Sequence, residues 1–270
     1  MIRLHTLGAI DLRDESGREV RAVLAQPKRL AMLAYLAAAS PRGSHRRDIL
    51  LGLFWPELDQ DHARNALSKA VHFLRRSLGE SALVSRSADD LGLDGALVWS
   101  DVAAFGAAWD GNRTEEALGL YRGDLLPSFF IPDAPGFEQW LEQERASLRL
   151  RASEAARLRA EWYEAGGDAA QAIECARRAV ALSNGDERLL RRLVELLDRL
   201  GDRSTALHAY DSFAGRLAAE LEVDPGAETV ALIERIRAAV SARASPPAEP
   251  VAPNASRDAD AAPSLIGQVD

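Results

Sequence analysis

The sequence has a single cysteine, Cys175, among its 270 residues. One cysteine excludes an intrachain disulfide and any metal site built from several cysteines, so we expect Cys175 to be a small buried apolar residue. No apolar run approaches the roughly 18 residues that a membrane-spanning helix needs, and residues 1–7 are too few and too polar for a signal peptide. These absences predict a cytoplasmic protein without membrane contact.

The motifs of common enzyme classes are also missing. The sequence has no Gly-rich phosphate loop ending in Lys-Ser or Lys-Thr, no paired-glycine fingerprint after a strand, and no Ser or Cys nucleophile with a partner pattern. The histidines are scattered at His5, His45, His62, His72 and His208. Acids such as Glu138, Glu142 and Glu144 lie in an arginine-rich stretch, where surface pairing at helical spacing explains them. We therefore expect no enzymatic activity, no cofactor and no metal.

Positive charge is scarce overall and unevenly placed. The net charge of −8 argues against a histone-like binder, which would be basic throughout. Residues 1–99 hold 14 Lys and Arg against 12 Asp and Glu, residues 100–240 hold 17 against 25, and residues 241–270 hold 2 against 4. Within the first third, residues 64–86 carry five basic residues and one acid. Only the first third of the chain is suited to bind a polyanion, and residues 64–86 are its most basic stretch.

The stretch 61–79 has the pattern of an amphipathic helix with a cationic face. At 3.6 residues per turn, one side collects the apolar residues Ala63, Leu67, Ala70, Val71, Leu74 and Leu78. The other side carries no acid and consists of Arg64, Asn65, Ser68, Lys69, His72, Arg75 and Arg76. Arg and Lys can grip phosphates, and Arg, Asn, Ser and Lys can read base edges in a major groove. Because such a face is more often simply solvated, the neighbouring segments decide its meaning.

The segments before this helix predict a small sheet and two further helices. Residues 2–24 alternate as in antiparallel strands, with a turn at 14–17. Pro27 suits the first position of a helix that ends before Ser40–Pro41. Ser44 is expected to cap a second helix, which ends at Trp55–Pro56. After a short connection, Asp59 or Asp61 can cap the third helix.

The segments after it predict a wing. Residues 83–87 and 91–94 flank a turn at 88–90 as a hairpin, with Arg86 near the tip, and 97–99 is a further short strand. Strands, three helices and a hairpin are the order of a winged helix-turn-helix. Its second paired helix enters the major groove, and its wing reaches the adjacent backbone or minor groove.

From residue 101 onward the pattern is almost entirely helical. Helical apolar spacing covers the segments 114–121, 137–163, 169–182, 187–200, 203–220 and 227–240. Gly167–Asp168 and Gly201–Asp202 lie 34 residues apart, and Ala172 matches Ala206 at the same offset, which is the tetratricopeptide register. We expect Trp140, Trp162 and Tyr163 to be core residues of these repeats, and Gly111–Asn112 to open an atypical first repeat.

The predicted fold is therefore mainly α. An N-terminal α+β winged helix-turn-helix at 1–100 is followed by an all-α, tetratricopeptide-like helical repeat domain at 101–240. Residues 241–270 contain five prolines among alanine and polar residues, and are expected to be a flexible tail or linker.

Several of these motifs resemble a known family of regulators. The sequence HARNALSKAVHFLRRSLG at 62–79 resembles the recognition helix of the SARP-type antibiotic regulators, and PKRLAMLAYL at 27–36 with DILLGLFW at 48–55 resembles the two helices before it. LYRGDLLP at 120–127, WLEQERASLR at 140–149 and LAAELEVDP at 217–225 are similar to the bacterial transcriptional activator domain (BTAD) that follows in that family. The resemblance covers about residues 2–238.

This resemblance implies an OmpR-type winged helix that binds repeated promoter sites in double-stranded DNA and activates transcription through RNA polymerase. By matching position, the outward residues of 64–76 face DNA, Arg86 lies on the wing, and Pro56, Glu57, Leu58, Asp59 and Gln60 form the loop offered to polymerase. Arg46 and Arg47 are candidate holders of backbone phosphates at the start of the second helix, or a solvated pair. No receiver or ATPase module is evident, so control by phosphorylation is not expected.

Two questions stay open at this level. The alternative function is a protein-interaction adaptor, in which the repeats bind a peptide and the winged helix docks protein rather than DNA. The repeats themselves have three candidate roles, which are homodimerisation, recognition of a peptide or other effector, and contact with polymerase. The sequence does not rank these roles.

Overall fold

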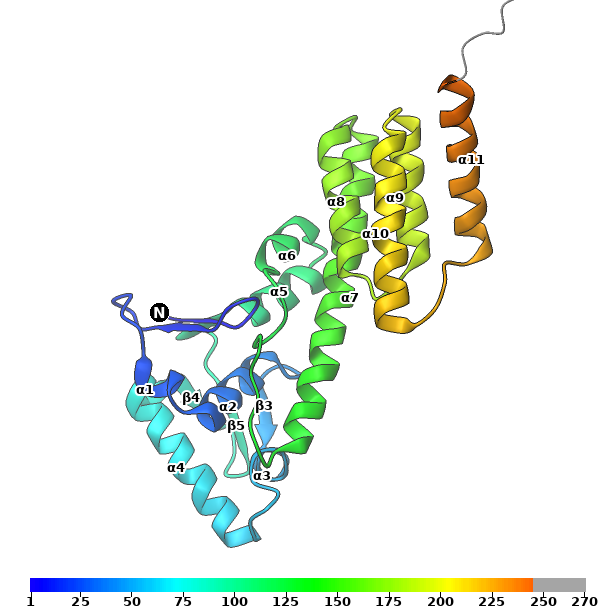
Figure 1. Ribbon diagram of the computed structural model, residues 1–270. Helices are drawn as coiled ribbons and strands as arrows, with labels where there is room; N and C mark the ends of the chain where they lie inside the picture. Colours follow the sequence, from blue (N-terminus) through cyan, green and yellow to red (C-terminus); the bar gives the residue numbers. More distant parts are fainter. Residues whose placement is uncertain (245–270) are drawn as a thin grey trace, which may run out of the picture.

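The computed structural model describes residues 1–244 and has two parts that both pack against the long helix α7 (Figure 1). The first part consists of β1 (Ile2–His5), β2 (Asp11–Arg13), α1 (Arg21–Leu24), α2 (Pro27–Ala38), β3 (Ser44–Arg46), α3 (Arg47–Phe54), α4 (Gln60–Leu78), η1 (Glu80–Ala82), β4 (Leu83–Val84), β5 (Asp90–Leu93) and β6 (Val98–Ser100). The second consists of α5 (Asp101–Asp110), α6 (Thr114–Leu120), α7 (Pro135–Ala165), α8 (Ala169–Leu182), α9 (Glu187–Arg199), α10 (Arg203–Leu221) and α11 (Ala227–Ala244). The predicted fold class, a winged helix-turn-helix followed by helical repeats, is confirmed.

Short strands form two three-stranded sheets in the first part. In the N-terminal sheet, β1 lies in the middle, antiparallel to β2 and parallel to β6. In the wing sheet, β5 lies in the middle and is antiparallel to both β3 and β4. The predicted hairpin is thus confirmed as β4–β5, and the predicted strand at 97–99 is confirmed as β6.

Two local predictions in this part were wrong. The segment predicted as a strand at 20–23 forms the single helical turn α1, which buries Val23 completely, and only Glu19 still bridges to Arg13. Ser44 does not cap a helix, because it belongs to β3 and pairs with Gly92 of the wing. Helix α3 begins three residues later, with Arg46 as an N-cap residue that makes no side-chain capping bond.

One hydrophobic core joins the first part to the beginning of the second. Helix α2 lies at its centre, with every residue from Leu30 to Ala38 buried. Helix α4 covers this core with its apolar face, and all six apolar residues predicted to face inward are buried. The same core continues through Phe105 of α5 and Phe137 of α7 as far as Ala152. The winged helix therefore packs directly against the first half of α7.

The second half of α7 begins the helical repeats. Helices α7 and α8 form one antiparallel pair and α9 and α10 form the next, and a second core extends through them from Ala160 to Ile236 of α11 (Figure 1). The paired turns are built alike, since Gly167 and Gly201 have φ values of +80° and +81°, which glycine adopts without strain. Ala172 and Ala206, the small residues predicted at the helix crossings, are both fully buried. The 34-residue repeat is therefore real in three dimensions.

The expectations for individual core residues hold only in part. Trp140 and Tyr163 are half-buried and pack against the two cores. Trp162 is 61% exposed, packs edge-to-face against Tyr163 and has the Arg159 guanidinium group over its ring, near the end of α7. Helical spacing in the sequence does not reveal that neighbouring helices cover only part of the surface of α7 near Trp162. Cys175 is half-buried rather than buried, and burial raises the pKa of its thiol.

The boundaries of the last helix differ from the sequence prediction. Helix α11 runs to Ala244, so the first four residues of the predicted tail are helical, and the remainder of that prediction lies outside the described residues. Among residues 1–244, no helix combines the length and the apolar character that crossing a membrane requires. The described chain also holds no group of three or more His, Cys, Asp or Glu placed to bind a metal ion.

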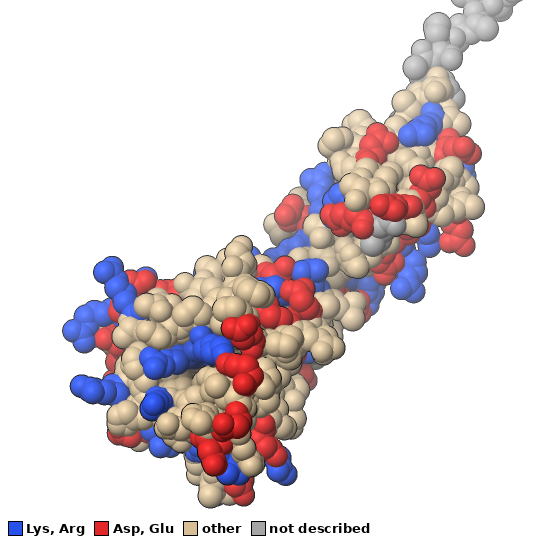
Figure 2. All heavy atoms as spheres, turned by 60° about the horizontal axis from the view of Figure 1, so that its bottom comes forward, with Lys and Arg blue, Asp and Glu red and all other residues tan. Residues whose placement is uncertain are grey.

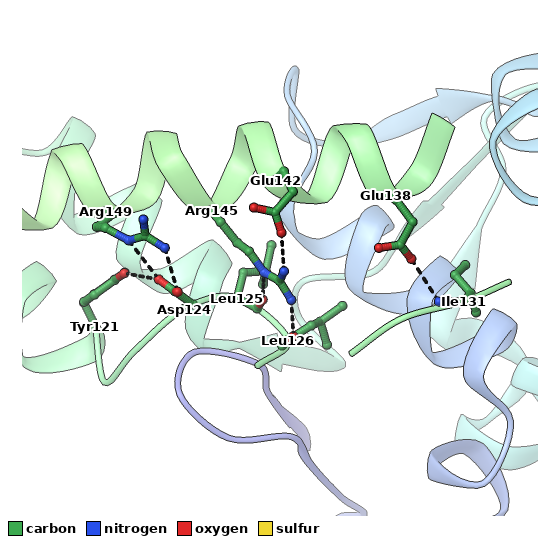
Figure 3. A network of polar contacts seen from close by, with 9 residues as sticks. All are labelled: Tyr121, Asp124, Leu125, Leu126, Ile131, Glu138, Glu142, Arg145 and Arg149. Atoms are coloured by element: carbon green, nitrogen blue, oxygen red, sulfur yellow. Dashed lines mark hydrogen bonds and ion pairs between the residues drawn. The ribbon is translucent and has the colours of Figure 1, made fainter. Parts of the chain in front are cut away.

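A loop between α6 and α7 ties the two parts together, and we refer to residues 121–131 as the strap (Figure 3). On one side, the strap hydrogen bonds to the N-terminal sheet, from Leu126 N to Thr6 O at 2.8 Å and from Gly8 N to Asp124 O at 3.0 Å. On the other side, Arg145 of α7 donates to the carbonyls of Leu125 and Leu126. The N-terminal sheet is thereby held against α7.

Candidate nucleic-acid interface

Helix α4 lies at the outer edge of the winged helix, away from the repeats (Figure 1). It starts at Gln60 because Asp59 caps it, accepting a hydrogen bond from the amide of His62 at 3.0 Å. It ends before Gly79, whose φ of +101° turns the chain toward the wing. Since its apolar side is buried in the core, its polar side faces solvent along the whole length of the helix.

The outward face of α4 carries several side chains with no internal partner. Asn65, Lys69, His72 and Arg76 are exposed, and within residues 1–244 none of them makes a side-chain hydrogen bond or ion pair. Arg64 is also exposed, with Asp61 at a distance of 3.7 Å, and the Ser68 hydroxyl donates to the Arg64 carbonyl. These six residues lie together on the solvent face, as the sequence predicted.

Arg75 differs from its predicted place on that face. Its side chain is half-buried, with Nη2 donating to the carbonyl of Leu83 at 3.2 Å and Nε enclosed without a partner in the described structure. Arg47 of α3 behaves in the same way, since its Nε is also enclosed and its Nη2 lies 3.5 Å from Ser85 Oγ. Both guanidinium groups therefore lie under the wing and support β4 and the residue that follows it.

The wing presents Arg86 at its turn. Asp90 closes this turn by accepting hydrogen bonds from the backbone amides of Arg86 at 2.7 Å and Ser87 at 3.0 Å. These bonds, the one from Ser87 first, hold the pKa of Asp90 below its ordinary value. The Arg86 side chain is exposed and has no ion-pair partner among the described residues. The turn is thus rigid while its guanidinium group is available.

The other predicted phosphate-holding residue, Arg46 at the N-cap of α3, already has a partner. Arg46 is exposed but donates from Nε and Nη2 to the carboxylate of Asp48, which lies in the first turn of the helix. This pair raises the pKa of Arg46 and lowers that of Asp48. A phosphate would have to compete with Asp48 for Arg46, so neither Arg46 nor Arg47 is a free cation.

The connection between α3 and α4 is exposed throughout residues 56–60, and Gln60 is already the first residue of α4. Lys28 of α2 holds this connection through an ion pair with Glu57 at 3.0 Å. Leu58, at its centre, leaves 39% of its surface exposed, and Ile49 of α3 leaves 47% exposed. The loop is therefore an anchored, solvent-facing segment with an apolar residue at its middle.

One cation near α4 was not found from the sequence. Arg29 of α2 stacks over Phe73 of α4, with its guanidinium carbon 3.9 Å from the ring centroid. On the helix, Phe73 lies between Lys69 and Arg76, four residues after one and three before the other. Arg29 thus adds a charge beside the outward face. Only a tertiary contact between α2 and α4 reveals it.

Seen from this end, the charges of the molecule are segregated. Figure 2 brings the end that contains α3 and α4 forward and shows Lys and Arg side chains gathered there beside a band of Asp and Glu side chains. A surface with unpaired cations and amide groups on a protruding helix suits a polyanion with readable edges. The acidic excess lies in residues 100–240.

Comparison with known proteins agrees with this architecture. Residues 107–237 match the family model of the bacterial transcriptional activator domain. The structure of Mycobacterium tuberculosis EmbR in complex with a low-affinity phosphopeptide is similar to the chain, with a TM-score of 0.60 and 25% sequence identity. The match covers 88% of this chain and 65% of the EmbR chain, so the chain spans about two thirds of that protein. No protein of curated function matches the sequence.

The family match and the structural match cover overlapping parts of the chain. The family model begins in α5 and ends in α11, whereas the EmbR likeness extends to most of the chain. Residues 107–237 are therefore similar to the bacterial transcriptional activator domain, and a winged helix-turn-helix followed by such a region gives the chain a SARP-like architecture.

Proposed function

We propose that the protein is a sequence-specific DNA-binding regulator that inserts α4 into the major groove. The observation that carries this proposal is the outward face of α4, where Asn65, Lys69, His72 and Arg76 have no internal partner within residues 1–244. Unpaired cations beside an amide and an imidazole on a protruding helix can bind phosphates and base edges together. An ordinary solvated helix face would more often pair such charges with acids along the helix.

The individual side chains have different parts in this proposal. Asn65, Ser68, Lys69 and His72 are the candidate base readers, and Arg64 and Arg76 are the candidate phosphate contacts. Arg86 on the wing is positioned to contact the adjacent backbone. For Arg75 and Arg47 the proposal changes from direct contact to support, because their guanidinium groups are engaged under the wing.

We further propose that the protein activates transcription at repeated promoter sites by contacting RNA polymerase through residues 56–60. Anchoring by the Lys28–Glu57 pair and the exposed Leu58 make this loop suited to docking a protein. In an in vitro transcription assay, Leu58→Asp should lose activation while its DNA affinity is unchanged. Full activation by this variant would contradict the role of the loop.

An electrophoretic shift with the DNA upstream of the protein's own coding region tests the DNA contact. Lys69→Ala combined with Arg76→Ala should abolish the shift, and Arg199→Ala combined with Arg235→Ala should leave it intact. The control pair removes the same charge from exposed positions on α9 and α11, at the far end of the molecule (Figure 1). Undiminished binding by the α4 variant would refute the assignment of α4.

The salt dependence separates this function from the adaptor alternative. Each phosphate contact releases counterions, so DNA affinity should fall steeply with added salt, roughly in proportion to the number of contacts. The α4 double variant should show a smaller slope than the control pair wherever residual binding is measurable. Absence of any DNA shift for the wild-type chain at low salt would favour a winged helix that docks protein.

A further inference from the structure

A cleft of about 420 Å³ lies among α8, α9 and α10, on the opposite part of the molecule from α4 (Figure 1). Its floor is apolar and consists of Val180, Leu193 and Phe213, which are buried. Arg177 of α8 and Arg216 of α10 also line it, and the guanidinium carbon of Arg216 lies 5.9 Å from the centroid of the Phe213 ring. Its volume lies within the roughly 300–1,000 Å³ range of pockets that hold small molecules.

The charge of this cleft is opposite to that of its surroundings. None of the residues that line it is an acid, whereas residues 100–240 as a whole hold 17 basic residues against 25 acids. Arg177 and Arg216 are exposed, and within residues 1–244 neither forms an ion pair. The positive charge of Arg177 also lowers the pKa of Asp202, but the main cause of that shift is the hydrogen bond between Asp202 and the Thr205 side chain. An anion in the cleft would therefore meet two available guanidinium groups.

A larger cavity on the other side of α9 does not share this property. It has a volume of about 750 Å³ and lies between α7 and α9. Each of its five arginines already forms an ion pair: Arg149, Arg157, Arg188, Arg191 and Arg192. An anion would have to displace a carboxylate at every one of them. The smaller cleft is thus the better anion site despite its size.

We propose that the cleft among α8, α9 and α10 binds a small amphipathic anion, a carboxylate, sulfonate or phosphate carried on an apolar body. The apolar body covers Val180, Leu193 and Phe213, and the anionic group lies between Arg177 and Arg216, where charge-assisted hydrogen bonds are available. The site is independent of the DNA-binding proposal, because none of its residues belongs to the winged helix.

Fluorescence titration of the full chain with 1-anilinonaphthalene-8-sulfonate tests this proposal, since the probe joins an aromatic body to one sulfonate. The wild type should bind it saturably at one site, and Arg177→Glu combined with Arg216→Glu should weaken binding at least tenfold. Arg199→Glu combined with Arg235→Glu, which makes the same charge change outside the cleft, should not change the affinity. Equal weakening in both double variants would show only a general charge effect and would overturn the proposal.

Two further binding measurements separate the contribution of the ligand's charge from that of the shape of the cleft. The neutral analogue N-phenyl-1-naphthylamine lacks the sulfonate, so it should bind at least tenfold more weakly than the sulfonate probe. Ala209→Trp fills the cleft without changing any charge and should abolish sulfonate binding while leaving the circular dichroism spectrum unchanged. Tight binding of the neutral analogue, or unchanged sulfonate binding by a folded Ala209→Trp variant, would contradict the proposed site.

Discussion

Arg149 of α7 holds both carboxylate oxygens of Asp124 in the strap, with Nη2 2.7 Å from Oδ2 and Nε 3.2 Å from Oδ1 (Figure 3). The hydroxyl of Tyr121 donates to the same carboxylate at 3.0 Å, and the backbone carbonyl of Asp124 accepts from Gly8. A single residue therefore links α7, through its side chain, to the N-terminal sheet, through its backbone. This link connects the N-terminal sheet of the winged helix to the long helix that begins the helical repeats.

The Asp124 carboxylate should make stability depend on acid pH. Burial by itself raises its pKa, but the hydrogen bonds from Arg149 and Tyr121 outweigh burial and hold the pKa below the ordinary value near 3.9. The pair therefore stabilises the fold above that value and loses its effect as the pH falls toward the lowered pKa. Because both groups are about a third exposed, Asp124→Asn should cost only about 1 kcal/mol at pH 7.

Urea unfolding at pH 7 and at about pH 3 measures this effect. The difference in unfolding free energy between the wild type and Asp124→Asn should shrink at the lower pH. Asp133→Asn removes the same charge from the same loop, where Asp133 has no hydrogen bond or ion pair within residues 1–244, and should stay within about 0.5 kcal/mol of the wild type. A difference for Asp124→Asn that is constant with pH would rule out the ion pair as its cause.

Asp101 should be one of the most costly polar residues to remove. It is 3% exposed and accepts hydrogen bonds from the amides of Thr6 and Leu7 and from the Thr6 hydroxyl, each at 2.9 Å. Asp101→Ala leaves buried amides without a partner, so we expect a loss of about 3 kcal/mol in the free energy of unfolding. Thr6→Val removes only the hydroxyl bond and should cost about 1 kcal/mol. Equal effects of the two variants in urea unfolding would contradict this assignment.

The faces of the long helices could be predicted from the sequence, because each depends on a local period. The six apolar residues of α4 repeat every three or four positions, and a helix that covers a core buries that stripe regardless of its neighbours. The 34-residue offset predicted Ala172 and Ala206 at helix crossings for the same reason. Lys69 and Arg76 were placed correctly on the outward face because they lie on the side of the helix opposite the apolar stripe.

The parts that depend on distant segments could not be predicted. Arg75 lies at the edge of the polar face, and only the position of β4 decides that it turns inward. Ser44 has the local signature of a helix cap, but the pairing of β3 with the wing prevails. The strap gives no periodic signal at all. Its close approach to the N-terminal sheet appears only in the folded chain, where a Cβ on Gly8 would lie 2.6 Å from the Arg122 carbonyl oxygen.

Packing at the helix crossing of the second repeat should be intolerant of larger side chains. Ala206 is fully buried in the second core, where α10 packs against α9, so Ala206→Leu should destabilise the protein by about 2 kcal/mol through overpacking. Ala218→Leu makes the same chemical change at an exposed position of the same helix and should be nearly neutral. Thermal unfolding of the two variants compares them directly. A stable Ala206→Leu variant would show that the crossing is looser than the structure indicates.

His45 should make the wing sensitive to mild acid. Its ring is 6% exposed, packs edge-on against Tyr35 at a centroid distance of 5.1 Å, and has its Nε2 enclosed without a hydrogen-bond partner in the described structure. Burial lowers the pKa of His45, so the unfolded chain takes up a proton at a higher pH than the folded one. Stability from this residue is complete above the ordinary histidine value near 6.5 and declines as the pH falls below it toward the lowered pKa. His45→Phe keeps a ring against Tyr35 and cannot be protonated, so its unfolding free energy should fall less than that of the wild type between pH 7 and pH 5. Parallel pH profiles for the two proteins would show that His45 is protonated as easily in the folded chain as in the unfolded one.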